Sequence, residues 1–282
     1  MTQFADSQGY MGPFSRDGTA SIAPTPPWHY AADFVTVEYW SNPAAVEALL
    51  PPWLTLHPDE QGLTTLSFVD WQACTDTGGE LLDPIRAQYR ECIMLVSVVY
   101  EGIPMHYSPY IVVDQDTSMA RGWVLGYPKK LGSVWITKSM GIPSIASPNL
   151  APGNVFAGTV AVKDRRLAEG NVRITSEADD SAVTFGSRPI VALRHFPSMF
   201  EGQHDEPAVF ELVRLQAENV IAGPVWEGTA NLSILESPTE TMSALPPVRV
   251  GRGWRYSLAM TNRYNYRLRD LRGARPGDSQ EN

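Results

Sequence analysis

The sequence predicts a mainly β protein, and three observations lead to this prediction. Runs rich in β-branched and aromatic residues recur along the chain, as at residues 34–40 and 93–100. Turn motifs such as Glu101-Gly102 and Asp179-Asp180-Ser181 separate these runs, which is typical of antiparallel strands. Strands do not alternate with amphipathic helices at a spacing of about 30 residues, so a doubly wound α/β sheet is disfavoured.

The predicted strands cover most of the chain between residues 34 and 221. In chain order they are residues 34–40, 66–71, 93–100, 110–113, 133–137, 155–162, 172–176, 182–185, 190–195 and 209–221. Each run combines Val, Ile, Thr, Phe, Tyr or Trp with few breaking residues, the composition that suits a pleated and partly buried surface.

Two short helices are expected beside these strands. Ser41 or Asn42 can cap a helix at residues 43–50, where Pro43 suits the first position and two further prolines end it. A second helix is expected at residues 117–123, just ahead of a pair of lysines. The predicted protein therefore has few and short helices.

The composition suggests a sizeable core between two weakly held ends. Residues 1–27 are rich in Gly, Ser, Thr and Pro, which predicts an extended or disordered N-terminal arm. Because 43% of the 282 residues are hydrophobic, the chain can fill a sizeable core and fits one large β domain or two small ones. Residues 271–282 are polar and are expected to form a frayed tail.

Charge and patterning exclude several classes of partner. The 22 Lys and Arg residues and 31 Asp and Glu residues give a net charge of −9, so neither nucleic acid nor an anionic membrane surface is an expected partner. No apolar run approaches the roughly 20 residues of a membrane span, and the start of the chain lacks signal-peptide features. Cys74 and Cys92 form no disulfide or metal framework. We expect a cytoplasmic protein.

The lysine pair at 129 and 130 is the most informative motif. It occurs in the segment GYPKKLG, residues 126–132, of an otherwise acidic protein. A lysine held in an apolar pocket loses its proton more readily and can then attack a ketone to form an imine. The alternative, two solvated lysines at a strand end, is the commoner fate of such a pair.

Burial is expected to activate only one lysine of this pair. In extended chain successive side chains leave on opposite faces, so only one of the two can enter the interior. Removal from water can lower a lysine pKa by about 3–5 units, whereas a partly screened charge several ångströms away shifts it modestly. The second lysine is therefore expected to be a minor or structural contributor.

Signatures of other catalytic machinery are absent from the sequence. It contains no Gly-x-Gly-x-x-Gly, no phosphate-binding loop and no Gly-x-Ser-x-Gly. The histidines have no metal-ligand spacing, and Asp114 and Asp116 are expected to cap the second helix rather than to bind a metal. We predict no metal site and no metal or nucleotide cofactor, with a lysine imine as the reactive group.

Several segments make the chain resemble the acetoacetate decarboxylase superfamily. Residues 127–132 match the family's aromatic-Pro-Lys-Lys-Leu-Gly segment, and Tyr89-Arg90-Glu91 matches its aromatic-x-Glu. Further matches are Ala120-x-Gly122, residues 33–56, Arg188-Pro189 with Pro197, Trp226-x-Gly228 and Leu245-Pro246. The resemblance covers roughly residues 28 to 265 and rests on several spaced anchors.

This resemblance implies a fold, an assembly and a set of site residues. The family fold is a closed, cone-like antiparallel β-barrel or sandwich with a few short helices, assembled into homo-oligomers. By resemblance, residues 28–270 are expected to form a single domain of this type. By resemblance, Lys129 forms the Schiff base, Glu91 moves a proton or orients the substrate, and Lys130 tunes or braces the nucleophile. Tyr89, Trp123 and Tyr127 lie in or beside the same matched segments and are predicted to bind substrate.

Departures from the family pattern bear on the reaction. Decarboxylating members carry an arginine just before the opening strand, implicated in handling the substrate carboxylate, and Ala31-Ala32 stand there in this chain. Decarboxylating members have Gly-Arg-Glu ahead of the lysines, whereas this chain has Gly122-Trp123. Their second glutamate has no secure match in this chain, in which Asp70 is the nearest acidic residue. Trp28, Trp71 and Trp123 indicate an aromatic pocket, although aromatic residues are ordinary in core strands.

We predict a Schiff-base lyase that binds a small keto acid and then carries out enamine chemistry. Aldol addition with dehydration, or retro-aldol cleavage, is slightly favoured over decarboxylation because the carboxylate-handling arginine is absent, and an aldehyde is the implied co-substrate. A true β-keto acid decarboxylase of the acetoacetate type is the alternative within this class. Outside it, the alternatives are a non-catalytic barrel that binds a carbonyl metabolite and a structural oligomer with solvated lysines.

Overall fold

Long strands make up most of the protein, as the β-branched and aromatic runs predict. The structure is a computed structural model that describes residues 2–4, 6–183 and 185–273. Strands β1 (Thr2–Phe4) and β2 (Ser7–Gly9) form a small separate sheet. The fifteen strands of the large sheet are β3 (Trp28–Trp40), β4 (Thr55–Leu56), β5 (Leu63–Cys74), β6 (Gln88–Tyr100), β7 (Ile103–Val113), β8 (Lys129–Leu131), β9 (Ser133–Ile136), β10 (Val155–Val162), β11 (Arg165–Ala178), β12 (Ile190–Phe196), β13 (Val209–Leu215), β14 (Glu218–Ala222), β15 (Val225–Ile234), β16 (Arg249–Asn262) and β17 (Asn265–Asp270).

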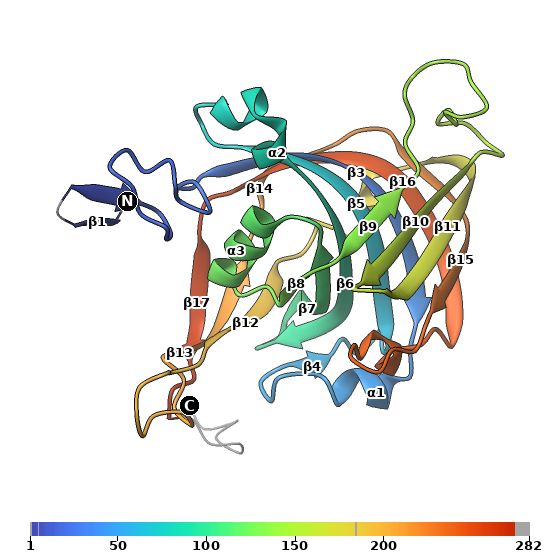
Figure 1. The fold of residues 1–282 in the computed structure, drawn as a ribbon. Helices are drawn as coiled ribbons and strands as arrows, with labels where there is room; N and C mark the ends of the chain where they lie inside the picture. The colour runs from blue at the N-terminus through green and yellow to red at the C-terminus, as the bar shows by residue number, and fades with distance from the viewer. Residues whose placement is uncertain (1, 5, 184, 274–282) are drawn as a thin grey trace.

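The helices are short: α1 (Pro43–Glu47) and α2 (Pro84–Ala87) lie at the periphery of the sheet, and α3 (Asp116–Leu125) lies over one of its faces (Figure 1). The 3-10 turns are η1 (Gly79–Leu82), η2 (Asp180–Ala182) and η3 (Met242–Ala244). The side chain of Asn42 caps α1, as predicted, by accepting a hydrogen bond from the amide of Ala44. In the part of the chain that the structure describes, no helix is both long enough and apolar enough to cross a membrane.

The large sheet is strongly curved (Figure 1). Its hydrogen-bonded order is β17–β13–β12–β7–β6–β5–β3–β16–β15–β11–β10–β9, while β14, β4 and β8 pair with β16, β6 and β7. The prediction of a mainly β fold of barrel or sandwich type with few helices is confirmed. Two details of the expected closed antiparallel ladder differ: β7 pairs in parallel with β8 and with β12, and the order ends at β17 and β9 without pairing between them among the described residues.

The parallel pairing of β7 and β8 has a simple cause. The chain leaves β7, runs through α3 and returns to the same edge of the sheet, and a crossover of this kind brings two strands together in the same direction. Lys129 therefore stands opposite Ile111 of β7. This crossover places the lysine pair directly beneath α3.

Two apolar cores lie on opposite faces of β5 and β6, because successive side chains of a strand alternate in direction. The larger core is mostly aliphatic, is called the aliphatic core below, and includes Leu66, Phe68, Met94, Val96, Phe156, Val160 and Val172. The aromatic core includes Trp28, Tyr30, Phe34, Trp71, Tyr89, Phe185 and Tyr256. Strands β9 to β11 fold over the first face, and α3 lies over the second.

Several predicted elements differ from the structure. The predicted strand at 209–221 is two strands, β13 and β14, separated at Gln216 and Ala217. The strand predicted at 182–185 is wrong for its described residues, because the Asp179 carboxylate accepts a hydrogen bond from the Ser181 amide and starts the turn η2. Strands β15, β16 and β17 were not predicted.

The N-terminal segment, residues 6–27, is more structured than its composition indicates. The backbones of Gln8 and Ser15 exchange two hydrogen bonds, and Ser21 is hydrogen-bonded to the backbone of Met11 and Ala23. Ala23 is completely buried. Of the predicted tail at 271–282, residues 274–282 lie outside the described residues, and Leu271 is buried.

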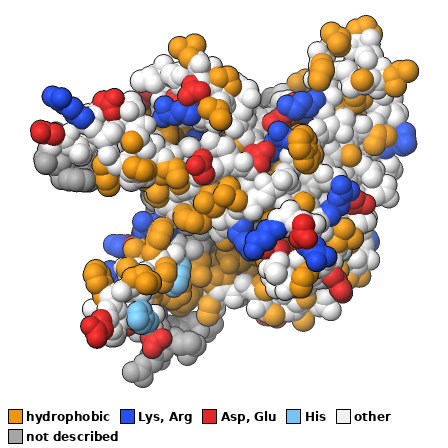
Figure 2. Space-filling model, viewed as in Figure 1, with side chains coloured by type: hydrophobic (Ala, Val, Ile, Leu, Met, Phe, Trp, Pro, Cys, Tyr) orange, Lys and Arg blue, Asp and Glu red, His pale blue; other side chains and the backbone are white. Residues whose placement is uncertain are grey.

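The loop between β9 and β10 projects from the body of the protein (Figure 1). Met140, Ile142 and Ile145 are exposed on it, and hydrophobic side chains gather at the tip of this projection at the upper right of Figure 2. Contiguous exposed apolar side chains of this kind are typical of surfaces that contact another molecule.

Candidate active site

Lys129 and Glu91 meet in the aromatic core although their strands do not pair with each other. Lys129 of β8 and Glu91 of β6 flank β7, opposite Ile111 and Val113 respectively. The Lys129 Nζ lies 2.7 Å from the Glu91 Oε2, and 9% and 5% of these side chains remain exposed. The pair is therefore buried and within the distance that direct proton transfer requires.

Helix α3 covers the Lys129 side chain. The Nζ donates a second hydrogen bond, 3.0 Å long, to the Oγ of Ser118 in the first turn of the helix. Gly122 passes so close that a Cβ there would lie 2.3 Å from the Lys129 Cδ. Only glycine leaves room for the lysine at this position, so the helix and the extended lysine side chain fit each other.

Burial is the main influence on the pKa of Lys129 and lowers it from its ordinary value of 10.5. The charge and hydrogen bond of Glu91 oppose this shift, and the nearby charge of Arg121 adds to it. The net direction is downward, so the neutral amine is more accessible than in a solvated lysine. The cause is burial, as the sequence predicts, and not the neighbouring Lys130.

Aromatic side chains surround the reactive pair. The Lys129 Nζ lies 5.3 Å from the ring centroid of Tyr89 and 5.9 Å from that of Tyr127. Burial raises the pKa of both phenols, so they stay protonated and can donate hydrogen bonds. The indole N–H of Trp71 donates to the Oε1 of Glu91 over 3.3 Å. The other carboxylate oxygen is thus left to face the lysine.

One cavity unites these groups. It is lined by Tyr30, Trp71, Tyr89, Glu91, Ile93, Ile111, Arg121, Gly122, Leu125, Tyr127, Lys129, Phe185, Met260 and Asn262. Four of the six site residues predicted from the sequence, Lys129, Glu91, Tyr89 and Tyr127, are among them. The space offers a nucleophilic amine, a carboxylate and several hydroxyl donors within an apolar wall.

Arg121 is the site residue that the sequence reasoning missed. It projects from α3 into the cavity and is only 4% exposed. Its signal was present in the sequence, because Ser118, Arg121, Gly122 and Leu125 recur at the spacing of one helix face, and all four are buried. A charged residue on the buried face of a short helix beside a reactive lysine is a candidate ligand-binding group.

This arginine corrects one inference made from the sequence. Ala31 and Ala32 do lie in β3 where an arginine was expected, but the pocket does not lack a guanidinium, because Arg121 supplies one from α3. Arginine binds carboxylates through two parallel N–H donors and keeps its charge when buried. A carboxylate-binding group is therefore available in this site.

Lys130 and Trp123 do not line the cavity. The Lys130 side chain is 55% exposed and forms an ion pair with Glu240, whose carboxylate oxygen lies 2.6 Å from its Nζ. Trp123 is 46% exposed, and its indole N–H donates to the backbone carbonyl of Lys129 over 2.8 Å. Direct roles for these two residues in catalysis and substrate binding have no geometric support. Trp123 instead holds the backbone at Lys129, and Lys130 pairs with Glu240 outside the cavity.

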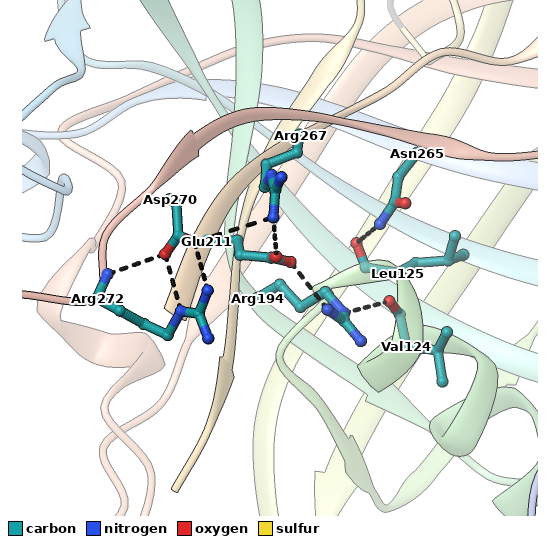
Figure 3. Close-up of polar contacts among 8 residues, drawn as sticks. All are labelled: Val124, Leu125, Arg194, Glu211, Asn265, Arg267, Asp270 and Arg272. Atoms are coloured by element: carbon teal, nitrogen blue, oxygen red, sulfur yellow. Dashed lines mark hydrogen bonds and ion pairs between the residues drawn. The ribbon is translucent and has the colours of Figure 1, made fainter. Parts of the chain in front are cut away.

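Polar side chains of β12 and β17 hold the C-terminal end of α3 (Figure 3). Arg194 of β12 donates to the carbonyl of Val124, and Asn265 of β17 donates to that of Leu125. Arg194 also pairs with Glu211 of β13 at 2.8 Å. The last backbone carbonyls of a helix have no partner within the helix, and hydrogen bonds and cations at these positions satisfy them. These contacts therefore fix the helix that carries Arg121.

Sequence comparison connects the chain with known proteins. A family model described as acetoacetate decarboxylase (ADC) matches residues 12–271. An acetoacetate decarboxylase of Streptomyces nogalater is 23% identical over 233 residues, which cover 82% of this chain and 84% of that protein.

Structural comparison gives closely similar folds. The enduracididine biosynthesis enzyme MppR, complexed with the condensation product of pyruvate and imidazole 4-carboxaldehyde, is 32% identical, with a TM-score of 0.87 over 95% of this chain and 98% of that chain. The same enzyme complexed with pyruvate has a TM-score of 0.86 at 32% identity, over 95% of this chain and 100% of that chain.

Proposed function

The chain belongs to the acetoacetate decarboxylase family and is an enzyme of that type, and on this premise we propose that Lys129 forms a Schiff base with a small keto acid. The observation that carries the proposal is the buried contact between Lys129 and Glu91 at 2.7 Å. A desolvated amine next to a carboxylate has both a nucleophile and a proton carrier for imine formation.

The proposed steps use groups that already touch one another. The free amine of Lys129 attacks the ketone carbon, the carbinolamine loses water, and the iminium draws electrons from the adjacent carbon. Glu91 accepts the proton released by the amine and returns it to the departing hydroxyl. Glu91, unprotonated again, takes a proton from the adjacent carbon to give an enamine, whose carbon adds to an aldehyde carbonyl while Glu91 returns the proton to the aldehyde oxygen. Loss of water and hydrolysis of the imine release the product and restore Lys129.

Arg121 can bind the carboxylate of the keto acid in either reaction, because decarboxylating members of the family also carry an arginine that handles this group. The missing arginine at residues 31 and 32 therefore no longer decides between the two routes. The MppR complexes with pyruvate and with its condensation product favour the aldol and dehydration route, or its retro-aldol reverse, over loss of CO2.

Decarboxylation of an acetoacetate-type keto acid is the second candidate. The curated relative from Streptomyces nogalater named acetoacetate decarboxylase favours it, and the same imine serves both reactions. The requirement for a lysine imine alone, without metal or nucleotide, is part of both proposals. The products distinguish the two reactions, because only decarboxylation releases CO2.

Borohydride trapping tests the proposal. The protein is reduced in the presence of pyruvate or acetoacetate, with and without an aromatic aldehyde, and the adduct is located by peptide mass spectrometry. We expect a pyruvate-derived mass on Lys129 and, with the aldehyde, the mass of a dehydrated condensation product. Adducts spread over exposed lysines, or none at Lys129 at saturating keto acid, would rule out the imine and favour a non-catalytic binding protein.

We also propose that the chain assembles with copies of itself in the cytoplasm. The exposed side chains of Met140, Ile142 and Ile145 at the tip of the β9–β10 loop support a contact surface. Light scattering at micromolar concentration tests the assembly, and Ile145→Glu is expected to weaken it. A monomer under these conditions would contradict this part of the proposal.

A further inference from the structure

Aromatic rings, and no acidic side chain, hold the guanidinium of Arg121. Its Cζ lies 5.8 Å from the ring centroid of Trp28, 5.5 Å from that of Tyr30 and 5.6 Å from that of Tyr89. It forms no ion pair or hydrogen bond with the residues that the structure describes, and its Nε is buried without a partner. The rings therefore set the position of the cation, while its N–H donors stay available for a ligand.

Trp28 differs from the other two rings because it does not line the cavity. Tyr30 and Tyr89 do so, whereas Trp28, at the start of β3, is 1% exposed and stands behind the guanidinium. Two of the contacts of its side chain come from the N-terminal segment. The indole N–H donates to the carbonyl of Pro24 over 3.0 Å, and the ring of Tyr10 packs edge-on at 5.9 Å between centroids.

The N-terminal segment is itself fastened between these two supports. Ser21 hydrogen-bonds to the backbone of Met11, next to Tyr10, and to that of Ala23, next to Pro24. An unbroken set of contacts thus leads from Tyr10 and Pro24 through Trp28 to Arg121. Since a planar guanidinium recognises a carboxylate only in a fixed orientation, any change in its ring contacts alters the recognition of that carboxylate.

From these contacts we infer that the N-terminal segment is part of the substrate-recognition apparatus: Tyr10 and Trp28 are positioning residues that hold Arg121 for the carboxylate of a keto acid. The inference rests on the proposed keto acid substrate. It gives residues 6–27 a role in the discrimination between a keto acid and a neutral ketone of the same shape. Neither Tyr10 nor Trp28 touches the substrate in this arrangement.

Calorimetric binding of pyruvate and of its neutral analogue pyruvamide to the full chain tests the inference. We expect Trp28→Leu to raise the dissociation constant of pyruvate about tenfold and Tyr10→Ala about threefold, the scale of one partly desolvated cation–π contact. Pyruvamide binding is expected to change less than twofold. Trp28→Phe, which keeps a ring over the guanidinium, should recover most of the loss. Tyr264→Ala, at a 58% exposed tyrosine, is the matched control and should leave both constants unchanged.

A double-variant cycle supplies the second readout. In an Arg121→Gln background, Tyr10→Ala should have no further effect on pyruvate, because the positioned group is already gone. Equal losses for pyruvate and pyruvamide, or an undiminished effect of Tyr10→Ala without Arg121, would overturn the inference. Tyr10 is only half-buried, so its variant stays informative if Trp28→Leu fails to fold.

The outcomes also separate this inference from the proposed function. If pyruvate binds in a manner that depends on Tyr10 and Arg121 but no imine is trapped, the positioning role stands and the Schiff-base mechanism fails. If an imine forms equally well with pyruvate and pyruvamide, the mechanism stands and the positioning role fails.

Discussion

The two faces of β5 and β6 carry the same backbone but opposite chemistry. On one face Phe68, Cys92 and Met94 pack in the aliphatic core, and on the other Trp71, Glu91 and Ile93 line the aromatic core and its cavity. Glu91 is the buried charged residue of this strand pair and lies on the second face, whereas Asp70 and Arg90 alternate onto the first face and stay partly exposed in ion pairs with Lys138 and Asp114. Neighbours in sequence such as Glu91 and Cys92 therefore serve either the chemistry or the stability of the fold.

The two cores differ in the space and the hydrogen-bonding groups that their side chains offer to a charged residue. The aliphatic core is filled so closely that a Cβ at Gly158 would lie 2.1 Å from the Phe68 ring. In the aromatic core, the indole of Trp71 donates to Glu91 and three rings hold Arg121. Aromatic side chains combine a large apolar surface with polar edges, so they can enclose charges that aliphatic side chains would leave unpaired.

Loss of Lys129 should have the largest effect on activity. We expect Lys129→Met to lower turnover by roughly 10⁴-fold or more, the scale for the loss of a covalent nucleophile. Because this change strands the buried carboxylate of Glu91, at a cost of about 3–5 kcal/mol, thermal unfolding must be followed as well. The double variant Lys129→Met with Glu91→Gln is expected to recover stability but not turnover. Substantial turnover in either variant would contradict the mechanism.

Phe68→Ala should have the largest effect on stability without a matching effect on specificity. We expect a loss of about 3–5 kcal/mol in the free energy of unfolding, measured with urea, because the fully buried ring leaves a cavity. The ratio of pyruvate to pyruvamide affinity should stay unchanged. Trp71→Phe on the opposite face is the matched comparison, and it should lower turnover more than stability since it removes the donor to Glu91. The opposite pattern would refute the division between the faces.

The fold and most of the pocket could be predicted from the sequence, whereas Arg121 and the contacts that hold it could not. Composition and turn motifs were sufficient for the mainly β fold, and the lysine segment with Tyr89-Arg90-Glu91 located most of the pocket. Arg121 was not predicted as a site residue because its role depends on the crossover that brings α3 over β8. Local composition does not encode this crossover. Tyr10 packs on Trp28, and Trp28 lies against Arg121, which is distant in the chain, so only the assembled structure shows that the three residues are related.

Gly122→Ala tests the fit between α3 and Lys129. The added Cβ would lie 2.3 Å from the Lys129 Cδ and 2.7 Å from its Cγ, so the side chain must move. We expect turnover to fall about 10²-fold, as for a displacement of about 1 Å at a reacting group, while the helix keeps or gains stability. Gly79→Ala, where a Cβ meets only the Thr77 Oγ1 at 3.6 Å, is the control. Unchanged turnover in Gly122→Ala would exclude this fit.

The pH dependence of imine formation should report the lowered pKa of Lys129. Below that pKa the free-amine fraction rises tenfold per pH unit, so the trapping rate should climb with pH and level off below 10.5. Glu91→Gln removes the group that raises the pKa, and its plateau is expected at lower pH. Between the lowered pKa and 10.5 the unfolded chain binds more protons, so this group's contribution to stability increases with pH. A plateau at or above 10.5 would contradict activation by burial.

Lys130→Ala should have the smallest effect and completes the comparison of the two adjacent lysines. Its ammonium lies outside the cavity, and because the Lys130 side chain is 55% exposed, its contact with Glu240 contributes about 0–1 kcal/mol to the free energy of unfolding. Because Lys129 owes its lowered pKa chiefly to burial, the pH profile of imine trapping should stay where it is in the unmodified protein. Trapping rates across pH 6–10 and urea unfolding measure both quantities. A shift of the whole profile toward higher pH would mean that the charge of Lys130, and not burial, activates its neighbour.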